Sequence, residues 1–305
     1  MTTHTASAWR VAIDTPALLG ESPFWHPDEQ CLYYCDIPAH RLHRWSPATG
    51  ELRHWQFDTD VASAAPFKDG SILLAMRDGL WRFDPATSRR SRLAPPPYDP
   101  LEQRFNDGKC DPQGRFWVGT LHDRREPSAS LFCLGTTGLR RMADHITVLN
   151  GLAFGQDARS LYFSDTSAHT VYACDIDDEG NLSAKRVHAR FATKQPGQDL
   201  ATYGGRPDGA AMDAEGCYWV AMFEGQRLLR LSPQGDVRDE FRLPVRCPTM
   251  PCFGGPDLKT IYLTTACHQR PPAELAEQPL AGCVLALDVE VPGLPTRFCA
   301  PIQGS

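Results

Sequence analysis

The chain has 305 residues, of which 42% are hydrophobic and 22% are charged, and its formal net charge is −6. These values are ordinary for a soluble globular protein, and the acidic balance argues against nucleic acid or an anionic membrane as the main partner. No apolar run approaches the roughly 18 residues that a membrane span requires, and Met1–Gly20 lacks the basic and apolar regions of a signal peptide. We therefore expect a cytoplasmic protein without a membrane-spanning segment.

The first predicted element is a strand at residues 9–14, WRVAID, and six mutually similar segments follow it along the chain. Each segment begins with a turn that contains Asp or Gly, continues into a short β-prone apolar run, and ends with small or polar residues. Their first apolar residues are separated by roughly 40 to 57 residues, close to the spacing of propeller blades. The segments are HPDEQCLYYCD (26–36), FKDGSILLAM (67–76), DPQGRFWVGT (111–120), GQDARSLYFSD (155–165), DAEGCYWVAM (213–222) and GPDLKTIYLTT (255–265).

A second strand-like run follows each segment and a third often follows that one, with turns such as SPATG and SPQG between them. Short antiparallel units repeated six times predict an all-β protein, a six-bladed β-propeller with four-stranded blades. A β-sandwich or a β-helix does not explain units of this length. The strand at 9–14 is expected to complete the last blade and close the ring, and only residues 271–280 indicate a helix. We interpret residues 1–305 as a single propeller domain, with its core at about 9–290 and a C-terminal tail beyond.

One register position recurs 9 to 11 residues ahead of each segment's first apolar residue. In a propeller the first strand of each blade lines the central channel, so equivalent positions of different blades lie at one height around one axis. We therefore expect four of these residues, distant in sequence, to form a polar ring at one mouth of the channel. The six positions are Glu21, Ser63, Asn106, Asn150, Asp208 and Met250, and the ring is Glu21, Asn106, Asn150 and Asp208.

Two carboxylates and two amides that face one another across a narrow channel need a compensating charge, and a divalent cation supplies it. Oxygen ligands without sulfur or imidazole suit hard ions such as Ca²⁺, Mg²⁺ or Mn²⁺. The alternative is local, because Asn-Gly and Asp-Gly are strong turn signals and each such residue alone is typical of a turn. The shared register favours the ring, as does Glu21, which occupies the same position without a following glycine.

Further polar residues lie near the expected ring. Arg104 stands two residues before Asn106, so it can reach over the mouth toward a substrate hydroxyl or carboxylate, or else form a surface salt bridge. His122 and Asp123 follow a strand and sit on a loop that can rim the site. No Ser-His-Asp order with a G-x-S-x-G elbow is present, so the sequence does not indicate a serine hydrolase.

The motifs quoted above, from about residue 17 to about residue 290, resemble those of the regucalcin/gluconolactonase family of the senescence-marker protein type. Within that family, CFGGPDLKTIYLTTA (252–266) looks most like the bacterial sugar lactonases. The resemblance implies a six-bladed propeller that hydrolyses aldonolactones with a divalent metal. The motifs that carry it are GESPFWHPDEQCLYYCDI (20–37), RFNDGKCDPQGRFWVGT (104–120), NGLAF (150–154) with LYFSDT (161–166), and RPDGAAMDAEGCYWVA (206–221).

The resemblance also implies roles for the ring residues. Glu21, Asn150 and Asp208 match the family's metal ligands, and Arg104 and Asn106 match its substrate-binding residues. The sequence departs from the family at one place. Animal members carry an acidic pair after the strand that corresponds to FWVGT, whereas this chain has His122-Asp123-Arg124. The departure bears on the choice of substrate and leaves the expected metal site unchanged.

The resulting hypothesis is a metal-dependent hydrolase that opens a sugar lactone to the sugar acid, with the ion as Lewis acid and an activated water as nucleophile. Asp208 is the predicted general base as well as a ligand. Ca²⁺, Zn²⁺, Mn²⁺, Mg²⁺ and Fe²⁺ all tolerate the ligand set, so the ion is left open, as is the oligomeric state. The alternatives are a calcium-binding regulatory propeller without catalysis and a propeller hydrolase of phosphotriesters or aryl esters.

Overall fold

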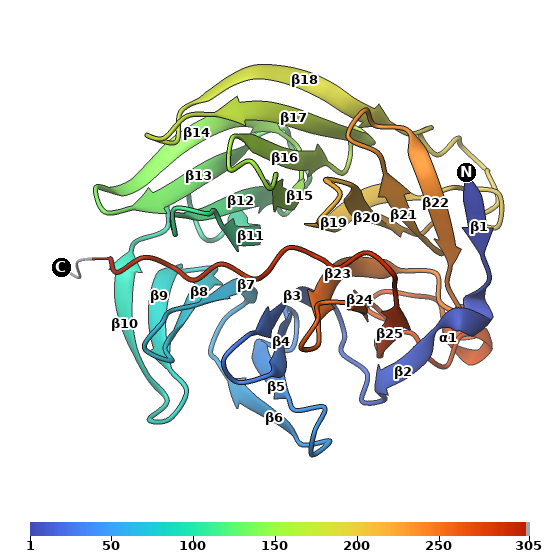
Figure 1. Ribbon diagram of the computed structural model, residues 1–305, viewed down its shortest axis with the longest axis horizontal. Coiled ribbons are helices and arrows are strands. Elements are labelled where there is room, and N and C mark those ends of the chain that lie inside the picture. The colour runs from blue at the N-terminus through green and yellow to red at the C-terminus, as the bar shows by residue number, and fades with distance from the viewer. Residues whose placement is uncertain (303–305) are drawn as a thin grey trace.

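The computed structural model describes residues 1–302, and it confirms the six-bladed β-propeller. Six sheets stand in a ring around a central axis (Figure 1). In blades 1 to 3 the strands follow chain order from the axis outward. These strands are β3 (Gly20–His26), β4 (Cys31–Asp36), β5 (Arg41–Trp45), β6 (Leu52–Gln56), β7 (Val61–Pro66), β8 (Ile72–Met76), β9 (Gly79–Asp84), β10 (Arg89–Ala94), β11 (Gln103–Cys110), β12 (Phe116–His122), β13 (Ala129–Gly135) and β14 (Gly138–Ile146).

Blades 4 and 5 repeat that order, and blade 6 takes its outermost strand from the N-terminal part of the chain. The strands are β15 (Leu149–Phe154), β16 (Ser160–Asp165), β17 (Thr170–Ile176), β18 (Leu182–Arg190), β19 (Arg206–Met212), β20 (Tyr218–Phe223), β21 (Arg227–Leu231), β22 (Val237–Arg242), β23 (Pro248–Gly254), β24 (Thr260–Thr265), β25 (Val284–Asp288) and β2 (Arg10–Ile13). The predicted helix is α1 (Pro272–Glu277). A 3-10 turn (Ala6–Ala8) separates β2 from β1 (Thr2–His4).

The ring is closed by a strand from each end of the propeller, as the sequence predicts. Strand β2 pairs antiparallel with β25, and Arg10 donates two hydrogen bonds to the Asp288 carboxylate at 2.8 and 2.9 Å. Strand β1 was not predicted. It adds to the outer edge of blade 5 by pairing in parallel with β22, which covers the backbone groups of that edge.

The core lies between the blades rather than inside a single layer. Blades 2 and 3, for example, share a cluster that includes Leu73, Phe105 and Phe116, all fully buried. Since both faces of the second strands are covered, strands such as β8 (ILLAM) and β20 (YWVAMF) read as continuous apolar runs instead of alternating patterns, whereas the innermost strands carry the polar ring residues. The outer strands are the exposed ones, and β18 keeps most of its side chains in solvent.

Each of the six inner strands carries a β-bulge beside its register position. Asn106, Asn150 and Asp208 lie inside β11, β15 and β19, so the interpretation of these residues as hairpin turns is wrong. The glycines after them serve another purpose. Gly151 has a left-handed φ of +63°, and an added Cβ there would meet the Tyr218 hydroxyl and lie 2.9 Å from the Asp208 carbonyl oxygen. The blades approach one another too closely at the axis for a side chain.

We expect Gly151→Ala to lower the free energy of unfolding by about 2–4 kcal/mol, because it adds both a collision with the next blade and a strained backbone. Gly50 is the matched control, since its φ is also left-handed (+73°) but nothing lies within 4 Å of an added Cβ. Gly50→Ala is expected to lose only about 1 kcal/mol. Chemical denaturation of both variants measures the difference, and equal losses would contradict the proposed close approach.

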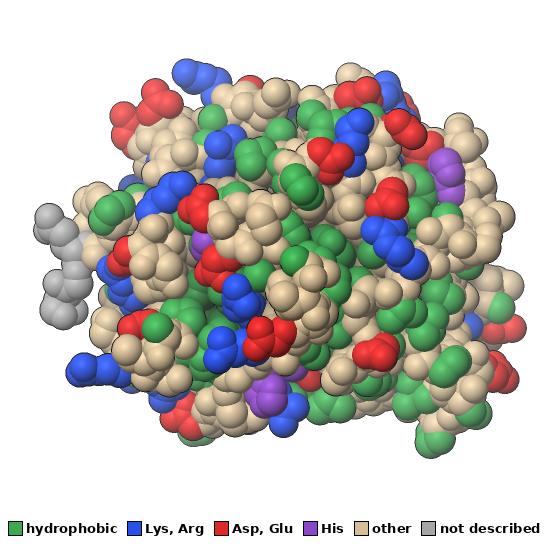
Figure 2. Space-filling model, turned by 60° about the horizontal axis from the view of Figure 1, so that its bottom comes forward, with side chains coloured by type: hydrophobic (Ala, Val, Ile, Leu, Met, Phe, Trp, Pro, Cys, Tyr) green, Lys and Arg blue, Asp and Glu red, His purple; other side chains and the backbone are tan. Residues whose placement is uncertain are grey.

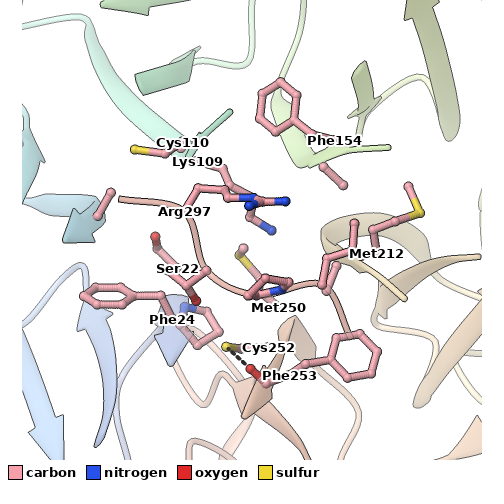
Figure 3. A pocket seen from close by; sticks show the side chains of 18 of the residues that line it. Ser22, Phe24, Lys109, Cys110, Phe154, Met212, Met250, Cys252, Phe253 and Arg297 are labelled. Carbon is pink, nitrogen blue, oxygen red and sulfur yellow. Dashed lines mark hydrogen bonds between the residues drawn. The ribbon is translucent and has the colours of Figure 1, made fainter. Parts of the chain in front are cut away.

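The C-terminal segment after residue 290 crosses the centre of the ring (Figure 1). Its backbone bonds to several blades, with the Leu294 amide on the Met212 carbonyl at 3.0 Å and the Cys299 amide on the Pro66 carbonyl at 2.8 Å. Beneath it lies a cavity of about 90 Å³ at the ends of the inner strands, lined by side chains such as Phe24, Met212 and Arg297 (Figure 3). This segment therefore covers one mouth of the channel and leaves the other as the open one.

Two further observations concern membrane-spanning helices and the distribution of charge on the surface. Among the described residues 1–302, no helix combines the length and the apolar character needed to cross a membrane. On the face shown in Figure 2, positive and negative side chains are interspersed, and that face presents no extended area of a single sign.

Candidate active site

The uncovered mouth holds a cavity of about 380 Å³ between the starts of the inner strands. All five residues with predicted roles line it: Glu21, Arg104, Asn106, Asn150 and Asp208. They come from four blades and lie as far apart in sequence as residues 21 and 208, so only the rotation of the blades about the axis brings them together. The two remaining register positions, Ser63 and Met250, are buried and do not line this cavity.

The lining has two levels that follow the period of a strand. Side chains two residues apart on a strand point to the same side. The residues one period before the ring positions therefore line the cavity nearer the mouth, and they are Leu19, Arg104, Val148 and Arg206. The outer level is thus half apolar and half arginine, whereas the inner level is wholly polar.

A chain of hydrogen bonds orients the two amides of the ring. Arg104 Nη1 donates to Asn106 Oδ1 at 2.9 Å, and Asn106 Nδ2 donates to Asn150 Oδ1 at 2.5 Å. Asn150 Nδ2 in turn donates to Thr166 Oγ1 at 2.8 Å. With its nitrogen bound to Thr166, Asn150 presents its oxygen to the ring. The amide is therefore held as an oxygen donor.

The two carboxylates of the ring are buried and close enough to repel each other. Burial first, and then the charges of Asp208 and Asp107, raise the pKa of Glu21 well above its usual value. Burial also raises the pKa of Asp208 to about 8, aided by the charge of Asp107 and opposed by Arg206, Arg125 and Arg104. Without a cation, Asp208 therefore favours its protonated form near neutral pH, and the ionised form of Glu21 is disfavoured as well.

These residues fit a divalent cation. Two buried carboxylates whose ionisation is suppressed and one amide oxygen fixed toward them make a hard oxygen donor set. The set has only two acids, and no group of three His, Cys, Asp or Glu side chains suited to a metal occurs within residues 1–302. An ion held by Glu21, Asn150 and Asp208 would therefore keep coordination positions free for water and substrate.

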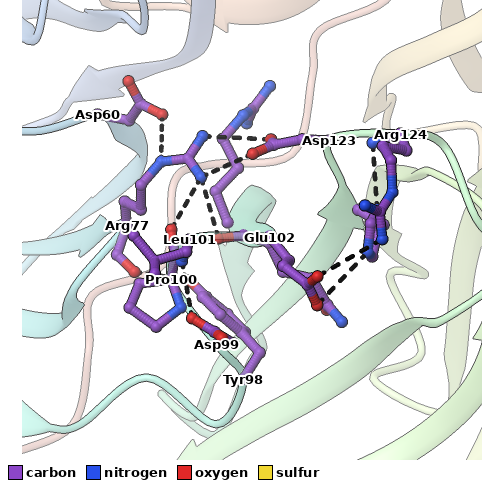
Figure 4. A network of polar contacts seen from close by, with 12 residues as sticks. Asp60, Arg77, Tyr98, Asp99, Pro100, Leu101, Glu102, Asp123 and Arg124 are labelled. Atoms are coloured by element: carbon purple, nitrogen blue, oxygen red, sulfur yellow. Dashed lines mark hydrogen bonds and ion pairs between the residues drawn. The ribbon is translucent and has the colours of Figure 1, made fainter.

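The loop after β12 contributes a residue other than the two that were expected. Neither His122 nor Asp123 lines the cavity. The Asp123 carboxylate pairs with Arg77, and His122 Nδ1 accepts the Arg124 amide at 3.1 Å (Figure 4 shows the Arg77 pair). Arg125 lines the cavity instead. The expectation that His122 and Asp123 rim the site is therefore not met, because their side chains serve to hold the loop.

Arg206 and His169 also line the cavity and were not predicted. Arg206 stands two residues before Asp208, as Arg104 stands two before Asn106, so the same register argument applied to RPD as to RFN would have identified it. His169 Nε2 lies 2.5 Å from the Tyr203 hydroxyl. Nothing in the local sequence pattern marks His169, because its place depends on the packing of a turn between two strands of blade 4.

The chain is similar to known proteins in sequence and in structure. The sequence model for the SMP-30/gluconolactonase/LRE-like region matches residues 19–267. A 6-deoxy-6-sulfogluconolactonase from Pseudomonas putida is 41% identical over 286 residues, which are 93% of this chain and 96% of that protein. Regucalcin from Xenopus laevis is 32% identical over 292 residues, 93% of each chain. A solved structure of a calcium-binding regucalcin from Agrobacterium tumefaciens has a TM-score of 0.91 at 26% identity, covering 99% of this chain and 100% of that one.

Proposed function

The chain belongs to the SMP-30/gluconolactonase/LRE-like family and is a sugar lactonase of that family, and we propose that it opens an aldonolactone with one divalent metal ion held by Glu21, Asn150 and Asp208. The observation that carries the proposal is the meeting of these three oxygen-bearing side chains in one cavity, from three blades. Relatives named as lactonases support the reaction, and the calcium-binding regucalcin of similar structure supports a metal.

The ion, when bound, supplies Lewis-acid stabilisation of the negative charge that develops on the lactone carbonyl oxygen. The chain's own acid is Asp208. We assign Asp208 the role of general base, which accepts a proton from the attacking water as the water oxygen bonds to the carbonyl carbon. It then returns a proton to the ring oxygen as the ester bond breaks, so that water is consumed and a hydroxy acid is released. A nearby cation lowers the pKa of Asp208 and so makes the ionised form available for this role.

Arg104 and Asn106 are proposed to hold the sugar. Arg104 Nη1 is engaged by the Phe105 carbonyl and by Asn106 Oδ1, both at 2.9 Å, which fixes the guanidinium in the cavity wall. Its remaining N–H groups are donors for sugar hydroxyls. Asn106 stands between Arg104 and Asn150 in the hydrogen-bond chain, so it ties the position of the sugar to that of the metal ligands.

A second candidate is a calcium-binding regulator without turnover. The description of the Agrobacterium relative as a calcium-binding protein favours it, since a ring of buried carboxylates also suits simple calcium retention. The two candidates share the metal and differ in chemistry. They are therefore separated by assays of hydrolysis, and not by metal binding.

The test is a substrate panel with protein stripped by EDTA and then reloaded with Ca²⁺, Mn²⁺, Zn²⁺ or Mg²⁺. We expect pH-stat assays to detect opening of 1,4- and 1,5-aldonolactones by the reloaded protein, and activity at least about 100-fold lower in the stripped protein. Paraoxon and phenyl acetate, a phosphotriester and an aryl ester, are run beside the lactones. Metal binding without lactone hydrolysis would support the calcium-binding regulator. Turnover of paraoxon or phenyl acetate that is faster than that of the lactones would support a hydrolase of phosphotriesters or aryl esters.

A further inference from the structure

Two arginines of the cavity have no part in the reaction outlined above. Arg125 comes from the loop between β12 and β13 of blade 3, and Arg206 is the first residue of β19 in blade 5. Both line the same cavity as Glu21 and Asp208. Desolvation first, and then the charge of Arg206, lower the pKa of Arg125, which indicates that the two guanidinium groups act on each other across the mouth.

Arg206 is held in place at the cavity by one ion pair and one aromatic contact. Its Nη1 lies 3.1 Å from Glu224 Oε2, and its guanidinium lies over the Phe223 ring at 5.0 Å. Glu224 is shared, because its other oxygen lies 2.8 Å from Arg270 Nη1. Glu224 thus bridges the two arginines, and Arg270 has a second carboxylate partner in Glu274, at 2.8 Å.

Arg125 is presented by a loop that is clamped on both sides of it. Arg77 reaches across from blade 2 and grips the Asp123 carboxylate with two hydrogen bonds, at 3.0 and 3.2 Å, while also bonding to Asp60 (Figure 4). Arg124 pairs with Glu126 at 3.0 Å. Arg125 itself, in a left-handed conformation (φ +60°), forms no ion pair within residues 1–302. Its side chain is exposed and lines the cavity, so its donors are available at the mouth.

The charges of the cavity do not balance for a neutral sugar. Glu21 and Asp208 would be offset by a bound divalent cation, which leaves Arg104 and Arg125 without a lining acid, while Arg206 shares Glu224 outside the lining. The hydroxyl groups of a neutral lactone cannot compensate guanidinium charges drawn together in a partly enclosed site, whereas an oxyanion can. A planar fork of donors is also the arrangement that best matches carboxylate, phosphate or sulfonate oxygens.

We infer that Arg125 and Arg206 form a subsite for an oxyanion carried by the substrate outside its lactone ring, so that the preferred substrates are anionic sugar lactones. The inference rests on the proposed lactonase function and names the substrate class of the same site. It assigns the anion to two arginines from blades 3 and 5, and it leaves Arg104 with the sugar hydroxyls.

The test compares kcat/KM for glucono-1,5-lactone with that for the same lactone bearing phosphate or sulfonate on C6, and for glucaro-1,4-lactone, which carries a carboxylate. We expect the parent protein to prefer at least one anionic lactone by about 10-fold or more. Arg125→Ala and Arg206→Ala should each reduce the ratio of anionic to neutral kcat/KM by about 10-fold to 100-fold. Comparison of the phosphate, sulfonate and carboxylate lactones identifies which oxyanion the subsite fits.

Arg141→Ala is the matched control, because it removes an exposed arginine of β14 in the same blade, outside the cavity, and should leave the ratio unchanged. Arg125→Lys should keep part of the preference, since it retains charge and loses the fork. Arg206→Ala should fold, because Glu224 keeps Arg270 as its partner.

A binding measurement separates failure of this inference from failure of the lactonase function. By calorimetry, 6-phosphogluconate should bind the metal-loaded parent at least about 10-fold more tightly than gluconate, and Arg125→Ala should abolish the difference. Two results would overturn the subsite alone. One is hydrolysis of gluconolactone with a ratio of anionic to neutral kcat/KM near one in the parent and all variants, and the other is equal binding of 6-phosphogluconate and gluconate. Absence of hydrolysis with any lactone would overturn the lactonase function, and the binding difference would still decide the subsite.

Discussion

Replacing Asp208 by asparagine is expected to lower kcat/KM for sugar lactones by about 1,000-fold or more. Asparagine preserves the shape and one oxygen donor at this position and removes the negative charge and the proton acceptor. If Asp208 both holds the ion and accepts the proton of water, the substitution weakens two contributions at once. Steady-state assays of the variant reloaded with excess Ca²⁺ or Mn²⁺ measure the loss. A variant that binds metal and keeps more than about a tenth of the parent activity would contradict the assignment.

The same substitution should not weaken the fold. Asp208 is a buried carboxylate whose ionisation is suppressed, with a pKa of about 8, so its charged form is unfavourable in the metal-free protein above that pH. Removing it should leave the melting temperature of the metal-free protein unchanged or higher at about pH 9. Loss of activity together with retained stability is the expected signature of a residue kept for function.

Asp213 provides the matched control in the same blade. Its carboxylate accepts hydrogen bonds from Trp219 Nε1 at 2.9 Å and Arg230 Nε at 2.8 Å, and it is fully buried at the opposite end of β19 from the cavity. Asp213→Asn should therefore lower the free energy of unfolding by about 3 kcal/mol. Its kcat/KM should stay within about threefold of the parent, because Asp213 touches no part of the cavity. Loss of activity in this variant would show that blade 5 is simply intolerant of change.

Divalent metal binding is expected to tighten steeply with pH, by at least about 100-fold from about pH 5.5 to about pH 7.5. The pKa values of Glu21 and Asp208 are both raised, the latter to about 8. The metal-free folded protein therefore holds more protons than the unfolded chain between about pH 4 and about pH 8. Its stability should fall as pH rises through that range. A cation must displace these protons, and each displaced proton raises the affinity about tenfold per pH unit.

Calorimetry with Mn²⁺ in buffers of different ionisation enthalpy counts the protons released. We expect at least one proton per ion near neutral pH in the parent and a smaller number in Asp208→Asn. Thermal melts should show that the stabilisation by Mn²⁺ is greater at about pH 8 than at about pH 5.5. An affinity that does not vary with pH, with no protons released, would mean that the ion does not bind these carboxylates.

The sequence alone was sufficient for the fold and for the meeting of the site residues. Strand content follows from short apolar runs punctuated by turns, and these are local properties of the chain. The repeat then predicts which residues distant in sequence lie close in space, because it places residues such as Glu21 and Asp208 at equivalent positions of different blades. Family likeness added the division of the ring into ligands and substrate-binding residues, and those roles stay a proposal.

Other features of the structure could not be predicted from the sequence pattern. The glycine after Asn150 reads locally as a turn, yet it lies in a bulged strand where the neighbouring Tyr218 excludes a side chain. The C-terminal segment lacks a repeat pattern, so nothing in its own residues predicts that it crosses the ring and covers one mouth. Strand β1 similarly has no local signal strong enough to predict its pairing with blade 5.

The charged residues of the cavity show most clearly which features the sequence predicts and which depend on the tertiary structure. The sequence by itself determined the six blades and the ring of oxygen donors, because periodicity and symmetry map one residue number onto one place. It did not identify the innermost strands, since the repeated apolar segments form the second strand of each blade. Only the tertiary structure decided that Arg125, and not His122 or Asp123, lines the cavity opposite Arg206. A loop's direction depends on partners outside it, here the grip of Arg77 on Asp123 from the neighbouring blade, and such non-local contacts leave no period in the sequence.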